Sequence, residues 1–214
     1  MEIKQGEKLL FVGDSITDCG RDRPLGEGTG DSLGSGYVSY VDALLQSVYP
    51  DRSIRLVNKG ISGNTVRDLE ARWHADVVEQ SPDWLVLMIG INDVWRQFSK
   101  PYQTETHIHS EEYEETIYRL INEVSGAKLV LMTPFYIEPN NQDRMRQRMD
   151  EYGKIMQDIA SETNALFIDT QKAFEPLLSC LHPSAIAQDR VHPNARGHMV
   201  LAKAFLTKVG FQWS

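Results

Sequence analysis

Residues 8–18 read KLLFVGDSITD, and this segment indicates which kind of sheet the chain builds. Its apolar run at residues 9–12 has no polar interruption and ends at Gly13, which is typical of a strand buried on both faces in a parallel sheet. Ligands of open α/β sheets bind where strands end, so we expect Ser15 at the rim of a crevice, as a candidate nucleophile. Ser15 belongs to a polar cluster that follows the run at once: Asp14, Ser15, Thr17 and Asp18.

The rest of the chain alternates short apolar runs with segments of helical periodicity. This order predicts right-handed β-α-β crossovers, and hence a five-stranded parallel sheet with helices on both faces. Two stretches without periodicity are expected to be irregular, one from Gly20 to Gly36 and one from Trp95 to His109. Further strands are expected at 54–58, 84–89, 128–132 and 165–169, and helices at 37–48, 66–77, 113–124 and 145–159, with a last helix that starts near Asn194 and turns Met199, Val200, Phe205, Leu206 and Val209 inward.

The length and composition fit one globular domain that spans residues 1–214. The formal net charge of −8 argues against a nucleic-acid partner, which needs a basic face. No run reaches the ~18 apolar residues that a membrane span requires, and no export signal is evident, so we expect a cytoplasmic protein with no membrane contact. Cys19 and Cys180, the only cysteines, are expected to be free thiols. Cys19 lies near Ser15, but nothing in the sequence places a histidine beside it.

A serine hydroxyl needs a base to take its proton, and that base is usually a histidine oriented by a carboxylate. Asp189 precedes His192 by three residues, a spacing that in a tight turn lets the carboxylate reach Nδ1 and leaves Nε2 for Ser15. The alternative is a surface turn with a proline at the helix start. The other histidines offer no comparable arrangement: His74, His107, His109, His182 and His198.

A second serine matches a known nucleophile pattern but lies in the wrong context. Residues 30–34 read GDSLG, which fits the G-x-S-x-G nucleophile elbow around Ser32. That motif has meaning only between a strand and a helix, and we expect residues 24–29 not to form a buried strand. Ser32 is therefore rejected in favour of Ser15.

Acyl transfer also needs hydrogen-bond donors for the developing oxyanion. Gly63 offers a backbone N–H that no side chain shields, Asn92 offers a side-chain amide after the third strand, and Ser15 adds its own N–H. Taken alone, each of these residues is more often part of an ordinary turn than of an active site. Because all three follow successive strands, they are expected at one edge of the sheet.

Four segments resemble, in order, the sequence blocks of the GDSL/SGNH hydrolases: GDSI at 13–16, NKGISGNT at 58–65, GIND at 90–93 and DRVHP at 189–193. This resemblance implies the flavodoxin-like, three-layer α/β/α sandwich of those enzymes. It also implies a nucleophile at Ser15, a base and orienting acid at His192 and Asp189, and oxyanion donors at Ser15, Gly63 and Asn92. Gly60 is a second glycine in its block, and Gly63 is preferred because it follows Ser62 just ahead of the helix cap.

The wider sequence resembles the bacterial acetylxylan esterases of this superfamily. The resemblance implies a serine esterase that removes acetyl groups from a small-molecule substrate, acetylated xylo-oligosaccharides, in a homo-oligomer that needs no metal or cofactor. Trp95, just past Asn92, is a candidate for stacking on a sugar ring, or else it packs beneath the loop. Asp14 is a second candidate for contact with substrate.

Other reaction classes stay open at this point. A lysophospholipase or thioesterase is the nearest alternative within the same superfamily. A metal-dependent phosphoesterase is another, since Asp14, Asp18 and Asp189 are candidate ligands for Mg²⁺. A non-catalytic sugar-binding module is the third.

Overall fold

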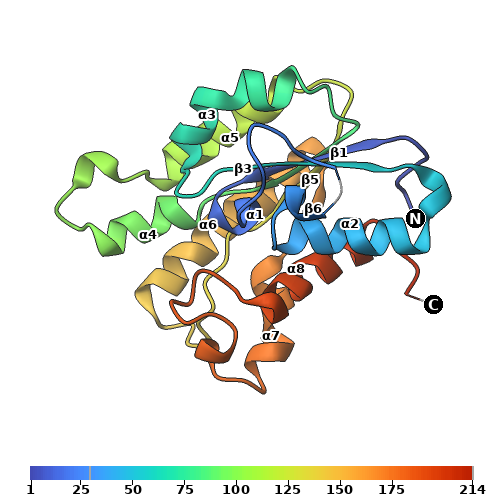
Figure 1. The fold of residues 1–214 in the computed structure, drawn as a ribbon. Helices are drawn as coiled ribbons and strands as arrows, with labels where there is room; N and C mark the ends of the chain where they lie inside the picture. The colour runs from blue at the N-terminus through green and yellow to red at the C-terminus, as the bar shows by residue number, and fades with distance from the viewer. Residues whose placement is uncertain (29, 214) are drawn as a thin grey trace.

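A computed structural model describes residues 1–28 and 30–213. Six strands form one sheet in the order β2-β3-β1-β4-β5-β6, with helices on both faces (Figure 1). All neighbours are parallel except β2 and β3, which pair in the antiparallel direction. The strands are β1 (Lys8–Gly13), β2 (Gly26–Glu27), β3 (Arg55–Gly60), β4 (Trp84–Met88), β5 (Lys128–Met132) and β6 (Leu166–Ile168).

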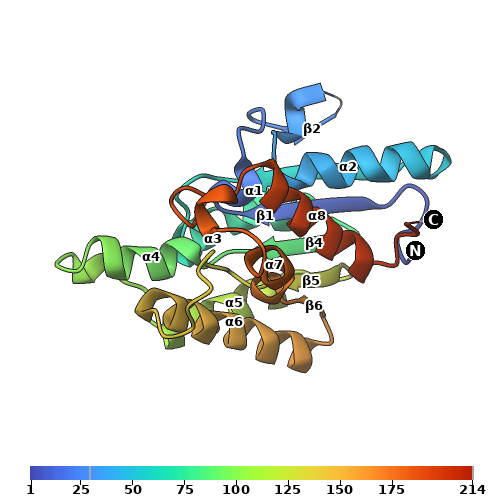
Figure 2. The same cartoon turned by 90° about the horizontal axis from the view of Figure 1, so that it is seen from below.

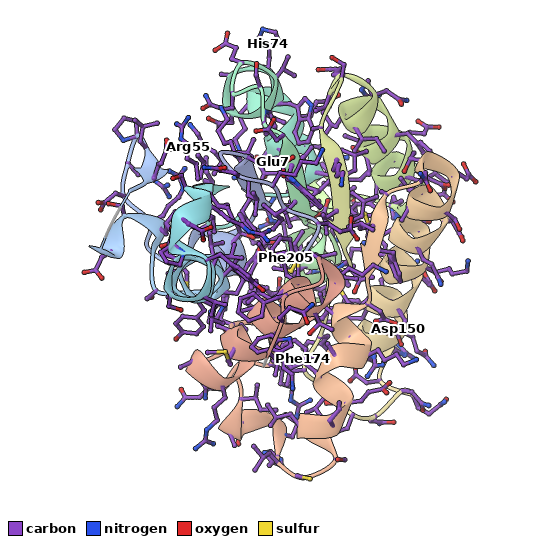
Figure 3. The ribbon with its side chains drawn as sticks, turned by 90° about the vertical axis from the view of Figure 1, so that its right-hand side faces the viewer. Glu7, Arg55, His74, Asp150, Phe174 and Phe205 are labelled. Carbon is purple, nitrogen blue, oxygen red and sulfur yellow. The ribbon has the colours of Figure 1, made fainter. Side chains whose placement is uncertain are left out.

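The apolar run of β1 lies at the centre of this sheet. Residues 9–12 are fully buried between β3 and β4, which explains why the run needs no polar alternation. Phe11 packs edge-on against Phe205 of the last helix, with the ring centroids 5.2 Å apart. Figure 3 labels Phe205 and Phe174, which come from neighbouring helices and are both fully buried.

The helices form two layers, as Figures 1 and 2 show. On one face α2 packs on α8, and α8 packs on α7. On the other face α3 packs on α5, and α5 on α6, which also covers β5 and β6. Their bounds are α1 (Ser15–Asp18), α2 (Tyr37–Val48), α3 (Val66–Trp73), α4 (Ile91–Ser99), α5 (Ser110–Asn122), α6 (Arg144–Thr163), α7 (Thr170–Leu178) and α8 (Ala195–Lys208).

The three-layer α/β/α arrangement is confirmed, with five parallel strands as expected, but several local predictions were wrong. A sixth strand, β2, lies in the stretch expected to be irregular, and Gly26 is buried beside Asn58 of β3. Helix α4 begins within the third block and carries Trp95, so that part of the chain is not a loop. Helix α7 was not predicted, and Met199 of α8 is 44 % exposed rather than turned inward.

Short helical turns complete the chain: η1 (Gly30–Leu33), η2 (Pro50–Arg52), η4 (Thr104–Thr106) and η5 (Pro183–Ala185), with a π-helical turn η3 (His74–Val78) that continues α3. Within the described part of the chain, no helix has the length and apolar character to cross a membrane.

Candidate active site

Ser15 stands where β1 ends and α1 begins. The turn is tight: a Cβ on Gly13 would lie 2.2 Å from the carbonyl oxygen of Met88, so only glycine fits there. Asp14 caps α1 by accepting a hydrogen bond from the N–H of Ile16 at 3.0 Å. Ser15 is thus the first residue of α1, half-buried, with a backbone N–H that has no acceptor within its own helix.

The structure brings Ser15, His192 and Asp189 together from opposite ends of the chain. Ser15 Oγ lies 2.8 Å from His192 Nε2, and His192 Nδ1 lies 2.6 Å from Asp189 Oδ2. The other carboxylate oxygen, Oδ1, accepts hydrogen bonds from the backbone N–H groups of Val191 and His192 at 3.0 and 2.8 Å. The carboxylate therefore fixes both the imidazole and the turn that carries it.

These contacts also keep Asp189 ionised. Burial raises the pKa of this carboxyl, but the hydrogen bonds from the ring and backbone of His192 and from the backbone of Val191 outweigh it and hold the pKa below its ordinary value. A charged acceptor at Nδ1 favours the tautomer in which Nε2 is free to take the Ser15 proton. The arrangement is that of a hydroxyl activated by general-base catalysis.

The loop at residues 61–64 lies beside α1, the helix that begins at Ser15, and is held at three points. The carboxylate of Asp18 accepts from Ser62 N–H at 2.9 Å, and Arg96 donates to the carbonyl of Gly63 at 2.7 Å. The amide of Asn92 donates to the carbonyl of Asn64 at 2.9 Å. One N–H of the Asn92 amide is used in this way, so the amide is oriented and its second N–H remains to donate.

Gly60 and Gly63 differ in what their N–H groups do. The Gly60 N–H donates to the side-chain oxygen of Asn58 at 2.9 Å, and a Cβ there would lie 2.2 Å from the backbone nitrogen of Asp18. Gly63 is exposed with φ +82°, and across residues 1–28 and 30–213 its N–H has no acceptor. The structure therefore favours Gly63 as the available donor.

Comparison with known proteins shows the family. The model of the GDSL-like lipase/acylhydrolase family matches residues 11–200. The chain belongs to that family. An acetylxylan esterase from Geobacillus stearothermophilus is 60 % identical over 215 residues, which cover 100 % of this chain and 98 % of that enzyme.

Solved structures agree with this assignment. The Geobacillus enzyme superposes with a TM-score of 0.97 at 59 % identity, over 100 % of this chain and 98 % of its own. Its catalytic mutants replace a serine, an aspartate or a histidine by alanine. The thioesterase 1/protease 1/lysophospholipase L1 of Escherichia coli is a more distant relative, 27 % identical over 77 % of this chain and 73 % of its own length.

Two buried carboxyls lie behind the triad of this GDSL-like hydrolase. Asp14 is 1 % exposed and Asp93 is fully buried, and burial raises the pKa of each to about 7. Asp93 Oδ1 accepts from the N–H of Val66 at the start of α3, whereas its Oδ2 has no hydrogen-bond partner in the described part of the chain. The burial of Asp14 favours a structural role for its carboxyl over the expected sugar contact.

Trp95 reaches the triad from α4. Its half-buried ring meets the ring of His192 edge-on, with the centroids 5.9 Å apart. Beside the histidine, a hollow of about 440 Å³ is lined by residues of the loop before α8, including Gln188, Asp189, His192 and Pro193. An aromatic ring and an open hollow thus flank the imidazole.

Sequence reasoning missed the partner of Cys19. The thiol lies 3.3 Å from Nε2 of His198, a residue of α8 that was given no role and that no sequence pattern placed beside Cys19. His198 Nδ1 accepts from the N–H of Tyr37, which in a neutral ring leaves Nε2 as the donor to sulfur. Burial raises the pKa of the thiol and lowers that of His198 to about 4, so this is a neutral pair and not an activated thiolate. Both cysteines are free, as predicted.

The three aspartates considered as metal ligands have separate partners. Asp14 caps α1, Asp18 accepts from Ser62 and from Arg23 at 2.7 Å, and Asp189 faces His192. Among the residues that the structure describes, no group of three or more His, Cys, Asp or Glu side chains gathers to hold a metal ion. Ser32 lies in η1, where its hydroxyl donates to the Asp22 carboxylate at 3.1 Å.

Proposed function

We propose that this protein is a serine esterase that removes acetyl groups from acetylated xylo-oligosaccharides. The observation that carries the proposal is the continuous path of hydrogen bonds from Ser15 Oγ through His192 to Asp189, at 2.8 and 2.6 Å. The substrate class is supported by 60 % identity, along the full chain, to an enzyme named acetylxylan esterase. We further propose that residues 1–214 act as one catalytic domain.

The reaction proceeds in two half-reactions. His192 Nε2 takes the proton of Ser15 as Oγ attacks the acetyl carbonyl carbon, and Asp189 stabilises the imidazolium that forms. The oxyanion accepts hydrogen bonds from the N–H groups of Ser15 and Gly63 and from the Asn92 amide. The sugar oxygen leaves with the proton from His192, and the acetyl group stays on Ser15.

Water then completes the cycle. His192 takes a proton from a water molecule, whose oxygen attacks the acetyl-Ser15 carbonyl. Collapse of the second tetrahedral intermediate returns the proton to Ser15 Oγ and releases acetate. Every proton passes through His192 Nε2, so this chemistry asks for no metal or cofactor.

Trp95 is proposed to contact the sugar. Its ring lies edge-on to that of His192, whose Nε2 must come within reach of the leaving sugar oxygen to give it a proton. Aromatic faces suit the apolar faces of pyranose rings. A lysophospholipase or thioesterase activity is the second candidate, favoured by the 27 % identity to the Escherichia coli enzyme of that name.

Acetate release from acetylated xylo-oligosaccharides, compared with hydrolysis of a long-chain acyl ester, separates these candidates. We expect rapid acetate release that Ser15→Ala abolishes and that the matched variant Ser32→Ala retains. Faster hydrolysis of the long-chain ester by the same protein would favour the second candidate. Full activity in Ser15→Ala would overturn the choice of nucleophile.

We also propose a cytoplasmic location, as the sequence analysis expects, and a homo-oligomeric state, which rests on the resemblance. Light scattering on the purified protein measures the oligomeric state directly. A mass of one chain would contradict the homo-oligomer.

A further inference from the structure

The turn that carries the triad contains a residue in an unfavourable backbone conformation. Arg190, between Asp189 and His192, has φ +62°, in the left-handed region. For a residue with a Cβ this conformation costs about 1–2 kcal/mol and persists only where the surroundings hold it. In the turn that has this conformation, the carboxylate of Asp189 accepts hydrogen bonds from the N–H groups of Val191 and His192.

The loop that follows β5 supplies the contacts that hold Arg190. The N–H of Ile137 donates to the carbonyl of Arg190 at 2.9 Å, and the Arg190 guanidinium pairs with Oε2 of Glu138. Glu138 is itself fixed: it is 8 % exposed, and its Oε1 accepts from the N–H of Asn140 at 2.8 Å. One short segment of another loop thus contacts both the backbone and the side chain of Arg190.

The segment that contacts Arg190 is itself hydrogen-bonded to two helices. Arg146 of α6 donates to the carbonyl of Glu138 at 2.6 Å, and the neighbouring Tyr136 N–H donates to the side chain of Gln171 on α7 at 2.8 Å. Residues 136–138 are therefore tied to two helices. A buried carboxylate on such a rigid support is able to hold a strained partner in place.

We propose that Glu138 is a positioning residue for the triad: by pairing with Arg190 it stabilises the left-handed turn that places Asp189 and His192 against Ser15. Glu138 touches none of the reacting atoms and acts only through Arg190. The proposal rests on the proposed function only in taking Ser15, His192 and Asp189 as the catalytic groups.

Glycine offers a direct test, because it adopts the left-handed conformation without the Cβ penalty. Glu138→Ala is expected to lower kcat about tenfold in the native background, which corresponds to an activation barrier raised by ~1.4 kcal/mol. KM is expected to change less than twofold. In the Arg190→Gly background the same substitution is expected to change kcat less than twofold, since the turn no longer needs the pair. Glu138→Gln keeps an acceptor for Asn140 while losing the charge, so it serves if the alanine variant fails to fold.

The matched control is Glu151→Gln, which breaks the exposed ion pair between Glu151 and Arg148 on α6 and involves none of the residues that hold the turn. Its kcat is expected to stay within twofold of the native value. Equal losses of kcat from Glu138→Ala or Glu138→Gln in both backgrounds, or no loss in either, overturn the proposal. Ser15-dependent hydrolysis of p-nitrophenyl acetate is the readout, so a failure of the sugar assignment leaves this test intact.

Discussion

Asp189→Asn separates the chemical role of this carboxylate from its structural role. The Oδ1 atom accepts two backbone N–H groups, and an asparagine keeps that oxygen in place. The amide nitrogen then faces His192 Nδ1, where Oδ2 stood at 2.6 Å. Because an amide N–H only donates, Nδ1 must accept, the ring proton moves to Nε2, and Nε2 no longer takes a proton from Ser15.

The expected loss in kcat is about 10⁴-fold, or roughly 5 kcal/mol in the barrier, as for other triads whose histidine is held in the wrong tautomer. The stability of the variant should change little. Asp189→Ala is the contrasting variant: it also removes two backbone hydrogen bonds worth about 1 kcal/mol each, so its free energy of unfolding should fall by about 2 kcal/mol.

Steady-state acetate release and urea unfolding measure the two quantities. An Asp189→Asn variant that keeps its kcat within tenfold of the native value would refute the reasoning. So would a variant that loses as much stability as Asp189→Ala.

Asn92→Ala removes a proposed oxyanion donor and should lower kcat by roughly 10²–10³-fold, in contrast to the smaller effect expected if the Asn92 amide only tethers Asn64. Burial lowers the pKa of His198 from 6.5 to about 4. The neutral ring therefore contributes to stability above pH 6.5, and this contribution is lost as the pH falls towards 4. Urea unfolding should show the free energy of unfolding fall by about 3 kcal/mol over that range. His198→Gln should flatten that part of the profile, and an unchanged slope would contradict the assignment. Incubation with EDTA should leave esterase activity intact, whereas loss of activity that Mg²⁺ restores would support metal-dependent chemistry.

The parts of the fold that sequence analysis predicted correctly are those fixed by local signals. The run at residues 9–12 is buried on both faces, and such a run needs no information from elsewhere in the chain. The expected start of a helix at residue 66 depends on another local signal, since Thr65 forms a capping box with Asp68 three residues later. The spacing of Asp189 and His192 belongs to the same class, because a carboxylate three residues before a histidine reaches its ring within one turn.

The features that were missed depend on distant contacts or conflicting local signals. β2 has only two residues and owes its pairing to Asn58 and Val57 of β3. Helix α7 contains Pro176, which local rules treat as a helix breaker. The pairing of Cys19 with His198 joins positions 179 residues apart, so no local spacing could reveal it.

Labelling with a fluorophosphonate, followed by mass spectrometry of the peptides, tests the central claim most directly. Such reagents phosphonylate a serine hydroxyl that a neighbouring base activates. We predict a single modified peptide, with the label on Ser15, and loss of that label in His192→Ala. A label on Ser32 or on any other residue, or undiminished labelling of Ser15 without the imidazole, would contradict the account.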